Sequence, residues 1–216
     1  MDRTAASDDL VLYYAPRTRS FAAVWLLEEL GAPYSLESFT LQSGRHKKED
    51  YLALNPLGKV PLIVDRGVPV PEMGAQAILF ADRYREHNLA PGVEEPERAA
   101  YLRWMFFSSA IMEPAMAEKM FGWEARPESV AWGSYARMID VFLKGLSEGP
   151  WLLGDRFTAA DVLVGCAAYF GVKFGAFPQE GPIVDYVGRV TEREAFGRAE
   201  AIEARESARL FPDDQA

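Results

Sequence analysis

Apolar and polar residues follow two kinds of pattern over the first 85 residues of the chain. Short apolar or alternating runs, which are typical of strands, predict strands at residues 10–14, 34–39, 60–64 and 68–70. Apolar residues at helical spacing predict two helices, at residues 18–30 and 73–84. The polar, basic segment 42–51 is expected to be irregular. The order strand, helix, strand, loop, strand, strand, helix predicts one α/β sheet domain.

Local signals indicate where some of these elements begin and end. Gly31 provides a C-terminal stop for the first helix. The tripeptide Asp65-Arg66-Gly67 predicts a hairpin between the last two strands. Further along, Thr158 and Asp161 form a capping-box pattern ahead of a strongly apolar run to Phe170.

Strand patterns end near residue 85, and helical patterns follow. Residues 86–96 hold two prolines, a glycine and several charges, which is typical of a linker. The helical patterns after it predict helices at residues 97–121, 127–147, 158–170, 182–191 and 194–210. Pro114 predicts a kink in the first of them, and Pro127 suits the first turn of the second. The chain is therefore expected to form an α/β domain at 8–86 and an all-helical domain at 97–212.

Composition excludes several classes of function. The 216 residues are 49% hydrophobic and carry a net charge of −9, which disfavours nucleic acid and anionic membrane surfaces as partners. Two histidines and one cysteine provide no ligand set for a metal, and a single cysteine excludes an internal disulfide. Residues 1–9 are polar and acidic, unlike a signal peptide, and no apolar run is long enough to cross a membrane. A cytoplasmic protein is expected.

A proline inside an apparent strand is the strongest sign of a ligand site. Pro61 has no N–H for a strand ladder, so the run from Val60 needs another explanation. A cis Val60-Pro61 bond at the strand entry would expose the Val60 backbone to a ligand. Glu72 follows eleven residues later at the start of a helix. This combination predicts a site that grips a peptide-like ligand by its backbone.

Three segments of the chain resemble the cytosolic glutathione transferase family, of the bacterial type. They are Tyr13-Tyr14-Ala15-Pro16-Arg17-Thr18-Arg19-Ser20 with the following Trp25–Gly31, Asn55-Pro56-Leu57-Gly58-Lys59-Val60-Pro61, and Trp151–Val162. The resemblance implies a thioredoxin-like domain that binds glutathione, followed by an all-α helical-bundle domain that supplies most of the electrophile pocket. It also implies a homodimer, glutathione as co-substrate, a small hydrophobic electrophile as second substrate, and a role in detoxification.

The resemblance places the glutathione thiol at the start of the first helix. A helix N-terminus with a hydroxyl donor can lower the pKa of a thiol. We rank Thr18 first as this donor, Ser20 second and Tyr14 third, although Thr18 could be only a helix cap and Tyr14 only a packing residue. Arg19 could favour the thiolate by its charge. Some classes of the family have a cysteine at the position of Arg19 and use it for disulfide exchange. Because this chain has no cysteine there, disulfide-exchange chemistry is not expected.

The remaining contacts to glutathione are implied in the same way. The Val60 backbone would pair with the cysteinyl part at Pro61, and Glu72 would hold the γ-glutamyl ammonium. Met73 stands where the family usually has serine or threonine, so a hydroxyl donor to the γ-glutamyl carboxylate is missing and affinity is expected to fall.

A basic cluster is expected at the other end of the ligand. The resemblance implies that the glycine carboxylate of glutathione is held by His46 and Lys47, with Lys59 as a further candidate. The alternative is that these residues form an ordinary solvated surface.

Several residues at helical spacing in the second domain either line the electrophile pocket or belong to the hydrophobic core of that domain. The resemblance favours the pocket for Trp104, Phe107, Ser108 and Ile111. The function implied is conjugation of the glutathione thiolate to a hydrophobic electrophile. Two alternatives stay open: a non-catalytic binding or assembly module on the same fold, and a glutathione-dependent isomerase, dehalogenase or reductase.

Overall fold

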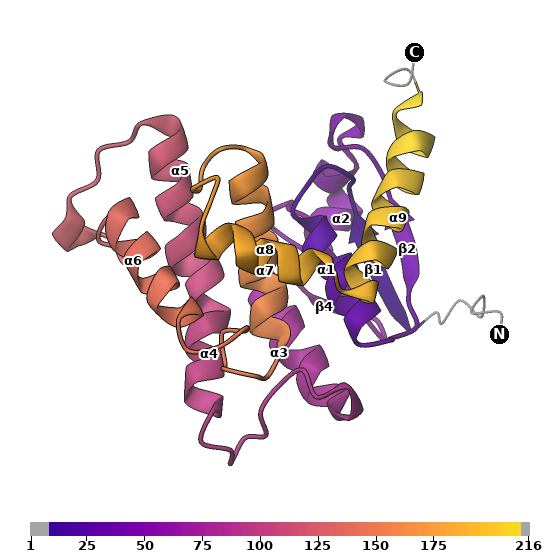
Figure 1. Cartoon of the computed structure of the whole chain (residues 1–216). Helices are drawn as coiled ribbons and strands as arrows, with labels where there is room; N and C mark the ends of the chain where they lie inside the picture. Colours follow the sequence, from indigo (N-terminus) through magenta and orange to yellow (C-terminus); the bar gives the residue numbers. More distant parts are fainter. Residues whose placement is uncertain (1–8, 213–216) are drawn as a thin grey trace. The chain divides into compact units, whose positions relative to one another are not determined.

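The computed structural model describes residues 9–212, which form two compact units (Figure 1). The first unit contains the chain up to Phe80 together with residues from Glu194 onward, and the second contains Ala81–Arg193. The sequence of residues 1–9 is unlike a signal peptide, but of this segment only Asp9 belongs to the described residues. No helix among the described residues is long and apolar enough to cross a membrane.

The first unit is built on a four-stranded mixed sheet. Its strands lie in the order β2-β1-β3-β4, with β1 parallel to β2 and antiparallel to β3. Their bounds are β1 Leu10–Tyr14, β2 Ser35–Ser38, β3 Leu62–Asp65 and β4 Val68–Val70. Arg66 and Gly67 turn the β3–β4 hairpin with φ of 49° and 80°, which confirms the predicted turn.

The segment 42–51 is more regular than predicted. It contains two short 3-10 helices, η1 Leu41–Ser43 and η2 Arg45–Lys47, and the start of α2 Glu49–Leu54. The Thr40 hydroxyl caps η1 by accepting from the Ser43 N–H at 3.2 Å. Tyr51 is fully buried and fixes α2 to the domain, so tertiary packing stabilises helical turns that the polar sequence does not signal.

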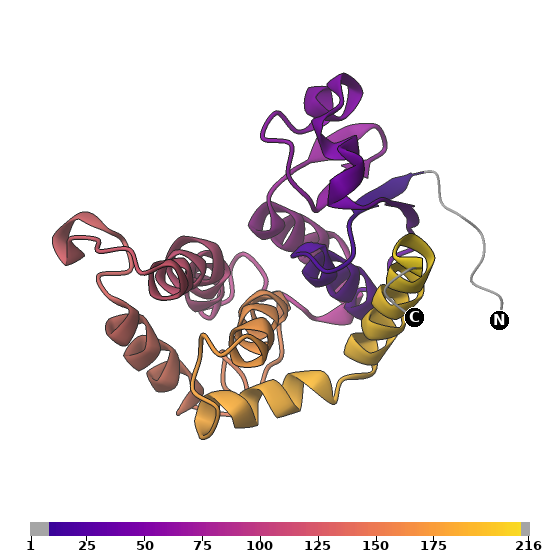
Figure 2. The ribbon, with the colours of Figure 1, turned by 90° about the horizontal axis from the view of Figure 1, so that it is seen from above.

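The C-terminal helix belongs to the first unit. α9 Glu194–Leu210 packs along α1 Ser20–Glu29, and both views show the two helices side by side (Figures 1 and 2). Phe196 meets Phe21 and Trp25 edge-on, with ring centroids 5.2 and 5.1 Å apart. The sequence-based division at 97–212 differs here, because it assigned this helix to the second domain.

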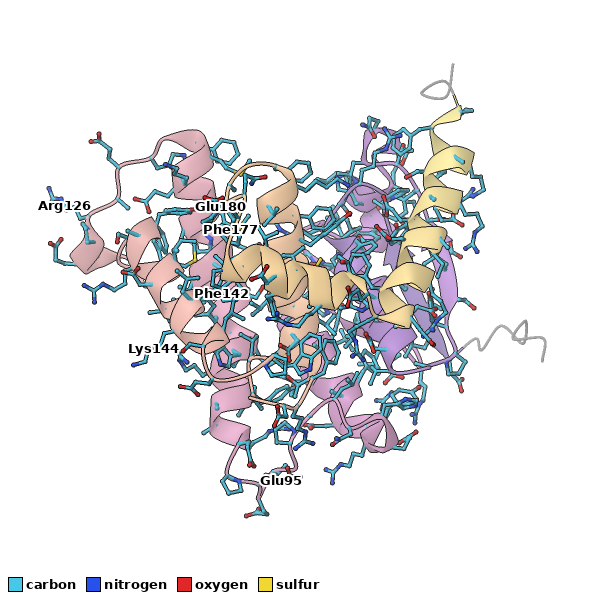
Figure 3. The ribbon with its side chains drawn as sticks, viewed as in Figure 1. Glu95, Arg126, Phe142, Lys144, Phe177 and Glu180 are labelled. Atoms are coloured by element: carbon cyan, nitrogen blue, oxygen red, sulfur yellow. The ribbon has the colours of Figure 1, made fainter. Side chains whose placement is uncertain are left out.

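The second unit is all-helical, and α3 Met73–Arg83 leads into it. Its longer helices are α4 Arg98–Phe107, α5 Glu113–Phe121, α6 Tyr135–Leu146, α7 Ala159–Lys173 and α8 Pro182–Thr191. Phe142 lies at the centre of this unit, with its ring 6.4 Å from Phe177, whereas the exposed Glu95 and Arg126 lie at its periphery (Figure 3).

Two expected helices differ in detail from those observed. The expected helix 97–121 is interrupted by a π-helical turn, η4 Ser108–Met112, just before Pro114. Pro114 has no N–H to donate to the preceding turn, which accounts for an interruption at this point. The second helix begins at Tyr135 instead of Pro127, which starts only a 3-10 turn. Ser134 is the N-cap that the pattern missed, and its hydroxyl accepts from the Arg137 N–H at 3.2 Å.

The predicted capping box at the start of α7 is confirmed. The Asp161 carboxylate accepts from the Thr158 N–H and the Leu152 N–H, both at 2.9 Å, and from the Tyr186 hydroxyl at 3.0 Å. Asp161 is fully buried. One side chain therefore joins the start of α7, the preceding loop and α8.

Replacing Gly145 by alanine is expected to destabilise the helical unit by about 2 kcal/mol. An added Cβ would lie 2.3 Å from the Trp104 ring, so this ring or the helix must shift. Thermal unfolding measures the effect. Gly188→Ala on α8 is the control, because nothing lies within 4 Å of its Cβ position and the change is expected to be neutral or stabilising. Equal melting temperatures for the two variants would contradict the expected clash.

Candidate functional site

The loop from β1 to α1 holds the hydroxyls predicted to contact a thiol. The Thr18 hydroxyl donates to the Ala15 carbonyl oxygen at 2.6 Å and lies 2.9 Å from the Ser20 hydroxyl. A hydroxyl carries one proton, so donation to Ala15 leaves Thr18 as an acceptor towards Ser20. Ser20 is fully buried, whereas Thr18 is only half-buried. Of the two, Thr18 is therefore the better placed to turn its proton towards a ligand.

Tyr14 lies in a different environment from the other two candidates. Its side chain is fully buried, and its hydroxyl donates to Glu203 on α9. The phenolic proton is held by a carboxylate and the side chain is out of contact with solvent, whereas the half-buried Thr18 gives its proton to a neutral carbonyl. Both differences count against Tyr14 as a donor to a bound thiol. Burial raises the pKa of Glu203, although hydrogen bonds from Arg17 and Ser207 act in the opposite sense.

Two arginines flank Thr18 and are held differently. Arg17 adopts a left-handed φ of 62°, its N–H donates to Glu203 at 2.7 Å, and its guanidinium lies 4.2 Å from the centre of the Phe211 ring. Arg19 occupies the N-cap position of α1 and its side chain is exposed. Arg19 is thus the charge that lies directly at the helix N-terminus.

The Val60-Pro61 peptide bond is cis, as predicted. The adjoining Lys59 carbonyl accepts from the Tyr51 hydroxyl at 2.6 Å and from the Asn55 side chain at 3.0 Å. On the other side, the buried Gln76 amide donates to the Pro61 carbonyl at 3.4 Å and to the Val70 carbonyl at 2.8 Å. These bonds fix the backbone on both sides of Val60.

Glu72 directly precedes α3 and has a left-handed φ of 70°. Such a conformation costs about 1–3 kcal/mol in a residue other than glycine and is common at ligand sites. The Glu72 side chain is exposed, and its carbonyl accepts from the Gln76 N–H at 3.0 Å. Met73 is the first residue of the helix and is half-buried. The roles of both residues towards glutathione stay predictions.

The structure brings the basic segment close to the cis-proline loop. Lys47 Nζ donates to the Gly58 carbonyl at 3.3 Å, and Lys59 is exposed nearby along the chain. The ring of His46 lies parallel to that of Phe39, with centroids 6.4 Å apart. Burial, followed by the charges of Lys47 and Lys59, lowers the pKa of His46, so this imidazole is neutral near pH 7. Of this pair, Lys47 provides the positive charge.

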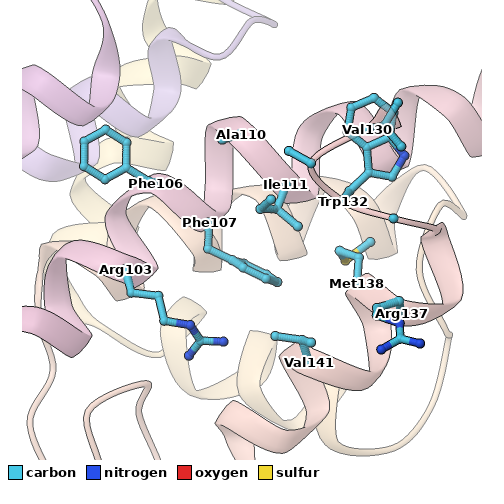
Figure 4. A pocket seen from close by; sticks show the side chains of 12 residues that line it. Arg103, Phe106, Phe107, Ala110, Ile111, Val130, Trp132, Arg137, Met138 and Val141 are labelled. Atoms are coloured by element: carbon cyan, nitrogen blue, oxygen red, sulfur yellow. The ribbon is translucent and has the colours of Figure 1, made fainter. Parts of the chain in front are cut away.

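In the helical unit, the four candidate pocket residues fall into two groups. Phe107 and Ile111 line a cavity of about 490 Å³ between α4, η4 and α6, closed on one side by Trp132 (Figure 4). Trp104 is buried against Phe107, with ring centroids 4.9 Å apart. Ser108 is buried and its hydroxyl donates to the Leu163 carbonyl at 3.4 Å. Trp104 and Ser108 are therefore part of the core, whereas Ile111 and the largely buried Phe107 line the cavity.

Sequence reasoning missed two residues that hold the site together. Gln76 joins the cis-proline loop to β4 and α3, and Glu203 joins the β1–α1 loop to α9. A glutamine in a helix and a glutamate in the C-terminal helix carry no local signal for these contacts. Among residues 9–212, no group of three or more His, Cys, Asp or Glu side chains could hold a metal ion.

Comparisons with known proteins agree with this architecture. The family model described as "Glutathione S-transferase, N-terminal domain" matches residues 9–80. Glutathione S-transferase 3 of Schizosaccharomyces pombe is 36% identical over 171 residues, which cover 70% of each chain. Disulfide-bond oxidoreductase YfcG of Escherichia coli is 28% identical over 164 residues, covering 70% of this chain and 75% of the relative.

Solved structures give the same result for the fold. A sphingomonad glutathione S-transferase complexed with glutathione superposes with a TM-score of 0.71 at 26% identity, covering 90% of this chain and 98% of that chain. The four-stranded sheet with its helices and the all-helical second unit form a thioredoxin-like domain followed by a helical domain, in agreement with this superposition. The chain belongs to the glutathione S-transferase family.

Proposed function

We propose that this protein binds reduced glutathione in its first unit and transfers the thiolate to a hydrophobic electrophile. The observation that carries the proposal is the fixed backbone at Val60, just before β3. The cis-proline and the hydrogen bonds to the Lys59 and Pro61 carbonyls hold this backbone in one conformation, which suits strand-like pairing with a peptide-like ligand. The family membership and the glutathione-bound sphingomonad relative support the choice of ligand.

Each end of glutathione has a proposed partner. Glu72 receives the γ-glutamyl ammonium, and the N–H of Met73 at the start of α3 receives the neighbouring carboxylate. Lys47 takes the glycine carboxylate, with the neutral His46 as a hydrogen-bonding partner and Lys59 as an outer charge. Calorimetric titration of the wild-type protein with reduced glutathione tests this binding, and no heat at millimolar ligand would overturn it.

Thr18 and the N-terminus of α1 activate the thiol in this proposal. When the Thr18 hydroxyl turns from the Ala15 carbonyl to the sulfur, it donates a hydrogen bond that favours the thiolate. The helix dipole and the Arg19 charge act in the same direction. The thiolate then attacks the electrophilic carbon, a new C–S bond forms and the leaving group departs with its electron pair, so no external oxidant or reductant is needed.

Replacing Thr18 by alanine is expected to lower the rate of conjugation to a generic aryl halide by about 10- to 100-fold. Glutathione affinity should change little, because the proposed ligand anchors remain in place. Steady-state kinetics and calorimetry measure the two quantities separately. Thr18→Ser keeps the hydroxyl and is the matched control, which should retain most of the activity. An unchanged rate in Thr18→Ala would transfer the role to a backbone amide or to Ser20.

A glutathione-dependent reductase is the second candidate, because the Escherichia coli relative is named a disulfide-bond oxidoreductase. The chain has one cysteine, the buried Cys166, and none near the start of α1, so a reductase here would use glutathione itself as the thiol. Parallel assays with an aryl halide and a small disulfide distinguish the two reactions. A non-catalytic role would leave both assays without turnover.

The electrophile pocket and a homodimer belong to the same proposal. Phe107 and Ile111 offer an apolar surface to a hydrophobic substrate. Phe106 lies beside them and is 60% exposed, which suits an interface with a second copy better than contact with water.

A further inference from the structure

A single carboxylate on the C-terminal helix holds two groups of the segment that leads to Thr18. Glu203 accepts from the Arg17 N–H with one oxygen, at 2.7 Å, and from the Tyr14 hydroxyl with the other. Ser207 also donates to it, at 3.4 Å. Tyr14 ends β1 and Arg17 directly precedes Thr18, so the two donors bracket the start of the loop.

The shape of this loop depends on Arg17. A left-handed φ of 62° at a residue other than glycine is unfavourable on its own and persists where neighbouring groups fix it. The bond from the Arg17 N–H to Glu203 is charge-assisted, which makes it a strong constraint on this conformation. Since Thr18 is the next residue, the same bond fixes the position of the Thr18 backbone, and with it the point from which the Thr18 side chain projects.

Other contacts anchor α9 on either side of Glu203. Towards its N-terminus, Phe196 packs against Phe21 and Trp25. Towards its C-terminus, the buried Glu206 accepts from the Ser38 hydroxyl of β2 at 2.5 Å. Glu203 is therefore presented from a helix that is held in place without it.

We propose that Glu203 is a positioning residue: it locks the Arg17 backbone and thereby places the Thr18 hydroxyl where it can stabilise the thiolate of bound glutathione. Glu203 does not touch the substrate itself. The inference rests on the proposed function for its last step, whereas the locking of the loop does not depend on glutathione.

The test compares Glu203→Ala with Glu206→Ala. Both substitutions remove a glutamate of α9 that accepts hydrogen bonds from the rest of the first unit, but only Glu203 contacts the loop before Thr18. In Glu203→Ala the apparent pKa of bound glutathione, followed by the ultraviolet absorbance of the thiolate, should rise by roughly one unit. kcat should fall about tenfold with the KM for the electrophile unchanged. Glu206→Ala should lower the melting temperature and leave both quantities as in the wild type.

Glu203→Gln provides a milder variant that retains one acceptor oxygen. Its amide oxygen can accept from the Arg17 N–H while its NH2 group donates to the Tyr14 hydroxyl, so the lock is kept without the negative charge, and its effect on the thiol pKa should lie between wild type and Glu203→Ala. This variant also guards against a simple folding defect in the alanine variant.

Amide hydrogen exchange gives a readout without glutathione. The peptide covering residues 15–20 should exchange at least roughly tenfold faster in Glu203→Ala and at the wild-type rate in Glu206→Ala. Unchanged exchange in Glu203→Ala would overturn the lock. Faster exchange with an unchanged thiol titration, or equal thiol shifts in both variants, would overturn the positioning role. If the wild type binds no glutathione, the proposed function fails, and the positioning role fails with it whatever the exchange result.

Discussion

Replacing Asp161 by alanine is expected to destabilise the helical unit by about 4 kcal/mol. The substitution leaves the Leu152 and Thr158 N–H groups and the Tyr186 hydroxyl inside the core without their acceptor. For a chain of this size, the melting temperature should fall by roughly 10 °C, which thermal unfolding followed by circular dichroism measures. The effect is large because one side chain serves three segments.

The matched control is Asp140→Ala on α6, where the aspartate is exposed. This change should alter the free energy of unfolding by less than about 0.5 kcal/mol. Similar losses in the two variants would show that the hydrogen bonds of Asp161 contribute nothing beyond an ordinary substitution.

The Asp161 carboxyl should also leave a signature in the pH dependence of stability. Burial raises its pKa to about 6, against the hydrogen bonds from Leu152, Thr158 and Tyr186, which lower it. The native state therefore holds this proton more tightly than the unfolded state, and the resulting stabilisation is present below about pH 4 and lost as the pH rises through about 6. The advantage in free energy of unfolding that wild type has over the non-titrating Asp161→Asn should accordingly become smaller as the pH rises from about 4 to about 6.

Replacing Glu72 by alanine is expected to weaken glutathione binding by about 10- to 100-fold. The proposed contact to the γ-glutamyl ammonium is a hydrogen bond between charged groups, worth about 1.5–3 kcal/mol. Calorimetry measures the change in Kd, and Glu37→Ala on the exposed side of β2 is the control with the same loss of charge. Equal affinities in Glu72→Ala and Glu37→Ala would remove Glu72 from the site.

The neighbouring position should respond in the opposite direction. Met73→Ser introduces a hydroxyl at the first residue of α3, where it can donate to the γ-glutamyl carboxylate. Affinity for glutathione is expected to rise by about tenfold. If affinity does not change, the carboxylate is already satisfied by the helix N-terminus, and Met73 explains no weakness in the site.

Much of the fold could be predicted because its signals are local. β1, α8 and α9 have the bounds that their apolar patterns predicted, and the Thr158–Asp161 pattern marks the capping box that begins α7. The errors arose where local signals were weak. Thr40 and the buried Tyr51 stabilise turns in a polar segment, and Ser134 begins α6 later than Pro127 suggested.

The candidate site was predictable only in part. The proline in a strand pattern, together with Glu72 eleven residues later, predicted the cis Val60-Pro61 bond, which the structure confirms. The choice of Thr18 and Ser20 came from the family resemblance and the helix start, and it stays a prediction. Which of these hydroxyls is accessible was not predictable, because it depends on their bonds to Ala15 and on burial. Similarly, the aromatic spacing of α4 could not show that Phe107 lines the cavity and Trp104 does not, since both are buried and lie at helical intervals.

The sequence by itself determined the sheet elements, the helical second unit and the cis-proline, because each follows from the spacing or chemistry of neighbouring residues. Only the tertiary structure decided that α9 packs on α1, that the Tyr14 hydroxyl donates to Glu203, and that Lys47 donates to the Gly58 carbonyl. Tyr14 and Glu203 are 189 residues apart along the chain. Contacts at such separations arise when helices and strands pack and bury their polar groups in pairs, and no local pattern records which pairs will form.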